Sequence, residues 1–200
     1  MAPLNEDQLE QIRIERKNQI MAAALKVFAE NGLKLTKISM IAKEAGISHG
    51  LLYHYFQSKE EVLYNSLEWA MTGTEELFDQ VNNLNASPKE RIKHFLKIAF
   101  TEGNSDVFRV IQHTIRANSP IPEPVKILID TSSAEYIKQL FPLFAQAQEH
   151  GEFILGDTQE LLELFLTIVS GIMMEGDLEW WKNNMDRKID LLLRMFTTKE

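Results

Sequence analysis

The stretch AGISHGLLYHYFQSKEE, Ala45 to Glu61, carries the most informative pattern in this 200-residue chain. Two short helical segments meet at Ala45–Ser48, a connection of a few residues that contains one glycine. Such a connection is typical of a helix-turn-helix. On the second segment, Leu52 and Phe56 are four residues apart and therefore lie on one helical face. We predict that this face packs on a core and that the opposite face is exposed.

The exposed face would carry tyrosine hydroxyls, imidazole rings and a glycine that lets the backbone approach a nucleic acid closely. An exposed face at the start of the second helix is what reading of the DNA major groove requires. Hydroxyl groups and a lysine at helix N-termini suit phosphate oxygens, because the helix dipole favours an anion there. We therefore predict that DNA is contacted by Thr36, Lys37, Ser48, His49, Gly50, Leu51, Tyr53, His54, Tyr55 and Lys59.

Several of these side chains have an alternative placement. Tyr53 and Tyr55 can belong partly to the core, with Tyr55 folded back on the first helix. His49 and His54 can be solvated surface groups. Their spacing of five residues, with no further ligand type in register, disfavours a metal site.

The same segment resembles the DNA-binding region of the TetR family of transcriptional regulators. Within residues 14–64, the matching pattern comprises Thr36, Ile41-Ala42, Ala45-Gly46-Ile47-Ser48, Gly50, Tyr53, Phe56 and Ser58-Lys59-Glu60-Glu61. Leu51 departs from the pattern, since a small or polar residue is common there, and it suits a thymine methyl group instead. The resemblance implies a three-helix DNA-binding head, a helical ligand-binding body, and binding of a dimer to a palindromic operator.

Helical periodicity extends along the rest of the chain, with almost no strand signal, so we predict an all-α protein of about nine helices. The first helix is expected near Glu15–Glu30, a long fourth from Ser58 or Lys59 to about Asn82, and an eighth from Asp157 to about Trp181. The expected organisation is a DNA-binding domain, residues 1–58, followed by a ligand-binding and dimerisation domain, residues 59–200.

Charge is divided unevenly between these two parts. The net charge is −8, yet residues 1–59 carry eight Lys/Arg against six Asp/Glu, whereas residues 60–200 carry thirteen against twenty-three. A mildly basic head on an acidic body can still present a positive face to DNA. The sequence lacks cysteine, a signal-peptide pattern and an apolar run of membrane length. We expect a cytoplasmic, nucleoid-associated protein without a membrane partner.

The body shows no catalytic motif, so we predict neither an enzyme nor a cofactor. The effector implied by the resemblance is a small hydrophobic or amphipathic molecule. Its candidate pocket residues, which are otherwise ordinary core or polar side chains, are Trp69, Phe95, Phe108, His113, Arg116, Tyr136, Phe144 and Met173. Apolar faces of the last two long helices predict a four-helix dimer interface through Leu161, Leu164, Phe165, Ile168, Ile189, Leu192, Leu193 and Phe196.

Together these observations predict a homodimeric, ligand-responsive regulator, a repressor that leaves its operator when the effector binds. Two alternatives remain at this point. One is a DNA-binding architectural or activator protein of the same fold that senses nothing, which a body without a ligand-sized cavity would favour. The other is an all-α carrier or enzyme whose helix-turn-helix is incidental, which a bound cofactor without DNA binding would favour.

Overall fold

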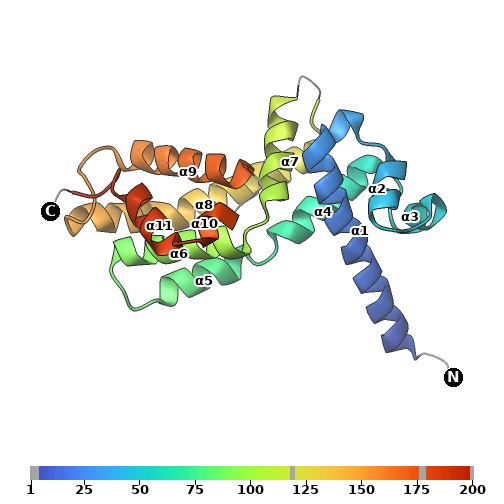
Figure 1. Cartoon of the computed structure of the whole chain (residues 1–200), viewed down its shortest axis with the longest axis horizontal. Helices are drawn as coiled ribbons and strands as arrows, with labels where there is room; N and C mark the ends of the chain where they lie inside the picture. The colour runs from blue at the N-terminus through green and yellow to red at the C-terminus, as the bar shows by residue number, and fades with distance from the viewer. Residues whose placement is uncertain (1–4, 118–119, 176–178, 199–200) are drawn as a thin grey trace. The chain divides into compact units, whose positions relative to one another are not determined.

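The computed structural model describes residues 5–117, 120–175 and 179–198, and the regular elements in these ranges are helices (Figure 1). An isolated β-bridge joins Phe153 and Thr197. The predicted all-α class is confirmed. The described helices are α1 (Glu6–Leu35), α2 (Ile38–Glu44), α3 (His49–Tyr55), α4 (Lys59–Met71), α5 (Thr74–Asn83), α6 (Pro88–Glu102), α7 (Ser105–Arg116), α8 (Glu123–Glu149), α9 (Thr158–Met174), α10 (Glu179–Lys182) and α11 (Met185–Leu193).

The chain forms two compact units. The first comprises the residues up to Ala70 together with Arg109–Leu128, and the second comprises Met71–Phe108 together with the residues from Ile129 onward. The first unit therefore contains most of α4 and parts of α7 and α8, in addition to α1–α3. It is larger than the head predicted for residues 1–58. Within the described ranges, none of the helices is both long and apolar enough to cross a membrane.

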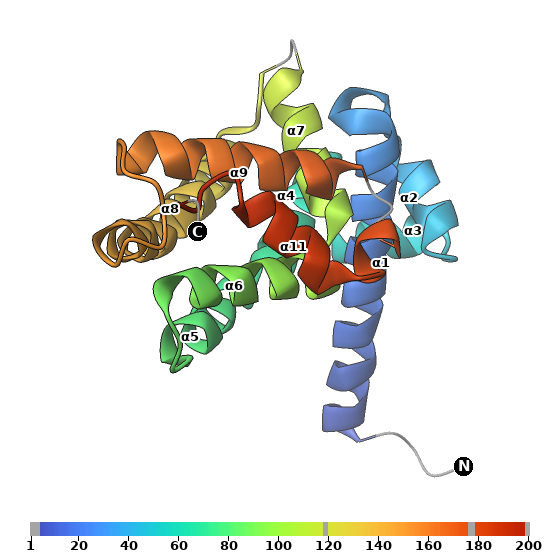
Figure 2. The same ribbon diagram turned by 60° about the vertical axis from the view of Figure 1, so that its left-hand side comes forward.

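Helix α1 begins at Glu6, well before the predicted start near Glu15. A capping box explains the earlier start: the Gln8 amide donates to the Asn5 side chain at 2.8 Å, and the Asn5 amide donates to the Gln8 side chain at 3.0 Å. The first turns are exposed and extend beyond α2 and α3, as Figures 1 and 2 show. An exposed arm has no buried apolar face, so hydrophobic periodicity did not reveal it.

The long fourth helix predicted from the sequence is divided into α4 and α5. Gly73 has a φ of +92°, in the left-handed region that glycine adopts without strain, and the Thr74 hydroxyl donates to the Met71 carbonyl at 2.9 Å. The predicted eighth helix also differs, since α9 ends at Met174. Part of that prediction, residues 176–178, lies outside the described ranges.

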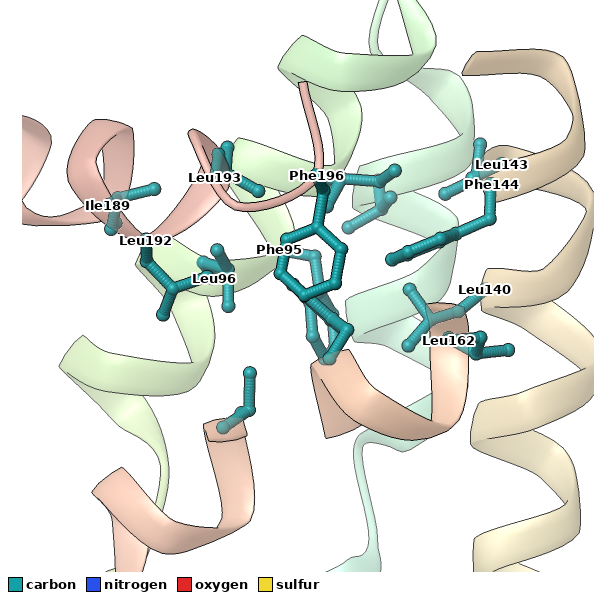
Figure 3. Close-up of a cluster of buried hydrophobic side chains, with 14 of the residues drawn as sticks. Phe95, Leu96, Leu140, Leu143, Phe144, Leu162, Ile189, Leu192, Leu193 and Phe196 are labelled. Atoms are coloured by element: carbon teal, nitrogen blue, oxygen red, sulfur yellow. The ribbon is translucent and has the colours of Figure 1, made fainter. Parts of the chain in front are cut away.

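The core of the second unit is built largely from phenylalanines. Phe95 of α6, Phe144 of α8 and Phe196, which follows α11, converge in its centre (Figure 3). Phe144 makes edge-on contacts with Phe153 and Phe165, both at 5.1 Å between ring centroids. Such pairs contribute about 0.5–1.5 kcal/mol each beyond the burial of apolar area. Seven phenylalanines are fully or almost fully buried here: Phe78, Phe95, Phe100, Phe144, Phe153, Phe165 and Phe196.

Two ion pairs fasten α11 onto α6. Lys93 Nζ lies 2.5 Å from Asp190 Oδ1, and Lys97 Nζ lies 2.5 Å from Asp186 Oδ1. The spacing of four residues on each helix aligns the pairs along one helix–helix contact. The hydrogen bond from Lys97 holds the pKa of the Asp186 carboxyl below its ordinary value. The hydrogen bond to Asp190 raises the pKa of Lys93.

The lowered pKa of Asp186 predicts an acid-dependent contribution to stability. Because the folded-state pKa is below the unfolded value of about 3.9, the contribution is present above that value and is lost as pH falls through the folded pKa. Lys97→Met keeps the apolar stem and removes the charge. The difference in the free energy of unfolding between wild type and this variant, measured by denaturant titration from pH 7 to pH 2.5, should shrink toward low pH. A difference independent of pH would contradict the assignment.

Candidate nucleic-acid interface

Helix α3 is held by one cap and two buried side chains. The Leu51 amide donates to the Ser48 hydroxyl oxygen at 3.1 Å, which satisfies one of the free amides of the first turn. Leu52 and Phe56 are 0% and 1% exposed, so the face predicted to pack on the core does so. The opposite face is consequently presented to solvent.

That exposed face carries the side chains predicted to meet DNA. His49, Gly50, Leu51, Tyr53 and His54 are all exposed, whereas Tyr55 is half-buried. The rings of His49 and Tyr53 meet edge-on with centroids 4.9 Å apart, which orders both side chains on the helix surface. The face thus offers imidazole and phenol groups for hydrogen bonds and an apolar Leu51 for a methyl group.

The turn before α3 is fixed on α1. Gly46 has a φ of +65°, and the Ile47 amide donates to the Ala42 carbonyl at 2.9 Å. The Gln19 side-chain amide of α1 donates to the Ala45 carbonyl at 2.8 Å. Because Ala42 and Ala45 are buried and small, α2 can pack closely beneath α3. The turn, and with it the start of α3, therefore has a defined position in the head.

Two residues predicted to bind phosphate have partners inside the head instead. Thr36 is 2% exposed, and its hydroxyl donates to the Gly32 carbonyl at 2.7 Å, so the predicted phosphate contact of Thr36 is wrong. Lys59 Nζ donates to the carbonyl oxygens of Leu33 at 2.7 Å and Thr36 at 3.1 Å. Backbone carbonyls leave no mark in a sequence, so residue type and spacing did not suggest these partners.

Positive charge near the reading face comes from residues outside α3, which contains no lysine or arginine. Lys37, predicted from the sequence, is exposed immediately before α2. The sequence reasoning did not identify Lys43, which is exposed on α2, or Arg16. The Arg16 guanidinium donates to the Gln19 side chain at 2.8 Å and so lies close to the helix-turn-helix turn. Lys43 lies within the motif itself, so its place in the sequence was the signal that was available.

Comparison with known proteins shows which type of DNA-binding region this head resembles. A family model described as "Bacterial regulatory proteins, tetR family" matches residues 20–64, which include all of α2 and α3. Residues 20–64 are thus a DNA-binding head of the TetR type. The protein is a transcriptional regulator that binds DNA, as the sequence predicted.

Similarity to TetR-type regulators extends beyond the head. The fatty acid metabolism regulator protein of Bacillus subtilis (strain 168) is 28% identical over 182 residues, 87% of each chain. HTH-type transcriptional regulator HbdR of Aromatoleum sp. (strain CIB) is 41% identical over 81 residues, 40% of this chain and 35% of that protein. The structure of the ketosteroid transcriptional regulator KstR2 of Mycobacterium tuberculosis has a TM-score of 0.71 and 21% identity, and the match covers 92% of this chain and 96% of that chain.

The eight predicted pocket residues do not form one group. Phe95, Phe144 and Met173 are fully or almost fully buried in the core of the second unit, and Phe108 and Tyr136 pack partly buried against that core. The other three residues belong to the first compact unit, where Trp69 is half-buried and His113 and Arg116 are exposed. Spacing along a helix did not distinguish these two environments.

Most of the predicted dimer residues are core residues, which corrects that prediction. Leu161 and Ile168 are half-buried and Leu164 is 49% exposed, so these three remain on an accessible face of α9. The other five already pack inside the chain's own core, where a partner subunit has no access. They are Phe165, Ile189, Leu192, Leu193 and Phe196.

Histidine side chains on α3 are expected to contribute to base preference. His49→Ala and His54→Ala should each relax preference at particular operator positions, at about 1–3 kcal/mol per lost base contact. The measurement is binding to a library of single-base operator variants. Glu30→Gln, an exposed change on α1, is the matched control and should keep the parental profile. Unchanged profiles in both histidine variants would show that these side chains do not read bases.

Proposed function

We propose that this protein is a repressor that binds a palindromic operator as a homodimer and releases it when an apolar effector binds. The observation that carries the proposal is the exposed face of α3, which presents His49, Tyr53 and His54 above the buried Leu52 and Phe56. In the head of a TetR-family protein, such a face suits insertion into the major groove. The protein would act on DNA in the bacterial cytoplasm.

Selection of bound fragments from the genomic DNA of the source organism tests the operator part of this proposal. The expected result is enrichment of a short inverted repeat with half-sites about one helical turn apart, or a multiple of it, because two symmetric heads must each reach a major groove. The position of the repeat within a promoter would support repression. Enrichment without any inverted repeat would contradict binding as a symmetric dimer.

The outward faces of α9 and α11 are suited to form the dimer interface with a second copy of the chain. Leu164 is 49% exposed on α9, and Leu191 and Met195 are 50% and 57% exposed on and just after α11. Half-buried Leu161 and Ile168 extend the α9 face at helical spacing. Exposed apolar side chains on two helices of each subunit are what a self-complementary four-helix contact requires.

Dimerisation through these faces predicts opposite outcomes for neighbouring substitutions. Leu164→Glu should give a folded monomer with much weaker operator binding, because the charge lies on the proposed interface. Phe165→Glu, one residue along, should instead unfold the second unit, because it places a charge in a fully buried position. Sedimentation velocity and circular dichroism measure the two outcomes. A Leu164→Glu protein that remains dimeric would place the interface elsewhere.

The effector is proposed to be a long apolar molecule with one polar end, of the size of a fatty acid or a steroid. The packed core of the second unit is rich in phenylalanines and contains Met173, whose flexible side chain can repack around a ligand. Tyr136 is half-buried, with its ring 5.3 Å from that of Phe78 and 6.3 Å from that of Phe95. Its hydroxyl makes no hydrogen bond within the described part of the chain, so it is available to orient a polar end. The names of the fatty acid and ketosteroid regulators support this class.

An effector that releases DNA must bind less tightly to the operator-bound protein. Coupling between two sites is reciprocal, typically 1–3 kcal/mol, so the operator should weaken effector binding by the factor by which the effector weakens operator binding. Calorimetric titration of a long-chain fatty acid and of a steroid, into free and operator-bound protein, measures this factor. Equal affinities in the two titrations would exclude that compound as an inducer.

Tyr136→Phe should weaken effector binding by about 1 kcal/mol, whereas Tyr64→Phe, on the exposed surface of α4, should not.

A further inference from the structure

The ammonium group of Lys59 lies at the end of α1, although Lys59 is the first residue of α4. Nζ donates to the Leu33 carbonyl at 2.7 Å and to the Thr36 carbonyl at 3.1 Å, and both bonds are partly buried. Leu33 and Thr36 follow Gly32, where the backbone of α1 is not helical, so Lys59 meets the short last segment of α1 beyond its continuous helix. A lysine ammonium placed there makes charge-assisted hydrogen bonds, which are stronger than neutral ones.

The α1 end that receives Lys59 is itself a tightly specified turn. Gly32 has a φ of +68°, which changes the direction of the chain before the last turn of α1. The Gly32 carbonyl accepts both the Thr36 amide at 3.2 Å and the Thr36 hydroxyl at 2.7 Å. This leaves the carbonyls of Leu33 and Thr36 directed toward Lys59. The turn and the lysine therefore complete each other's hydrogen bonding.

The bond between Lys59 and Thr36 also joins the two ends of the reading motif. Thr36 is the last residue before Lys37, which occupies the N-cap position of α2, and Lys59 is the first residue after the segment that ends at Ser58. The helix-turn-helix is thus bracketed by two residues that are hydrogen-bonded to each other. Closing a loop in this way restricts the movement of everything between its ends.

We infer that Lys59 is an internal clamp that closes the helix-turn-helix and positions α3, rather than an anchor for a DNA phosphate. The expected effect of Lys59 on operator affinity rests on the proposed function. Its expected effect on the structure of the head concerns the free protein and does not depend on DNA. Lys59 acts through α3 and is therefore a positioning residue. Its removal loosens the reading motif as a whole, whereas removal of a phosphate anchor reduces the charge that meets DNA.

The salt dependence of operator binding separates these two roles. Each lost phosphate contact lowers the slope of log K against log salt by about 0.9, so a phosphate role predicts a lower slope for Lys59→Met. The clamp predicts an affinity loss of about tenfold or more, from two lost charge-assisted bonds, with the parental slope retained. Lys37→Met, which removes an exposed charge immediately before α2, is the matched control and should lower the slope. A slope that falls as much in Lys59→Met as in Lys37→Met would overturn the inference.

Hydrogen exchange in the free protein provides a readout that does not need DNA. Lys59→Met should accelerate amide exchange by about tenfold in residues 32–41 and 48–56. Residues 92–100 of α6 serve as the internal reference and should exchange as in the wild type. Parental protection of residues 32–41 in Lys59→Met would refute the clamp. Absence of operator binding would defeat the proposed function while leaving this result decisive for Lys59.

A measurement on the wild type covers the case in which Lys59→Met does not fold. In the folded protein, the nitrogen-15 signal of the Lys59 ammonium should show slowed proton exchange, because two of its protons are held by carbonyls. Addition of operator DNA should leave that signal nearly unchanged, while the Lys37 ammonium signal shifts. A fast-exchanging Lys59 ammonium that is immobilised only when DNA is added would contradict the inference.

Discussion

A helix of seven residues does not persist in water by its own hydrogen bonds, and this constraint governs the whole head. Helix α3 has that length, and it exists because Leu52 and Phe56 are buried four residues apart on one face. The Ser48 cap and the bond from Gln19 to the turn carbonyl fix where the helix starts. The exposed residues of α3 contribute little to packing. Their side chains can therefore be of types that suit DNA contacts.

The chemistry of this face divides recognition between two sets of residues. Helix α3 carries histidine, tyrosine and leucine but no lysine or arginine, so its side chains are suited to base edges and methyl groups. Exposed residues beside it, such as Lys37 on the approach to α2, would supply the charge for the phosphates under the proposed function. Because the remainder of the chain is acidic, the proposed operator binding would rely on the cations of residues 1–59 for phosphate contacts and on α3 for base contacts.

The sequence predicted those parts of the molecule whose signals are local. Glycine in the turn, a serine cap and apolar residues four apart were enough to predict the motif and its buried face, and helical periodicity along the chain predicted the all-α class. The hydrogen-bond partners of Lys59 and Thr36 were not predicted, because they are backbone carbonyls, which have no identity in a sequence. Phe165 and Phe196 were misjudged for a different reason. Helix α9 is apolar on more than one side, and periodicity does not distinguish the side that meets its own core from the side that meets a partner.

The turn at the end of α1 is where the helices of the first unit converge. Lys59 of α4 is bonded to Leu33 and Thr36, and a Cβ added to Gly32 would lie 4.0 Å from the His113 side chain of α7. Helices α4 and α7 each also contain residues of the second unit, so both continue covalently from the body into the head. A shift of either helix acts on the same few residues, Gly32 to Thr36, immediately before the reading motif. Packed elements change between discrete arrangements rather than deforming gradually, so under the proposed function a displacement of α4 or α7 would reach α3 through this turn.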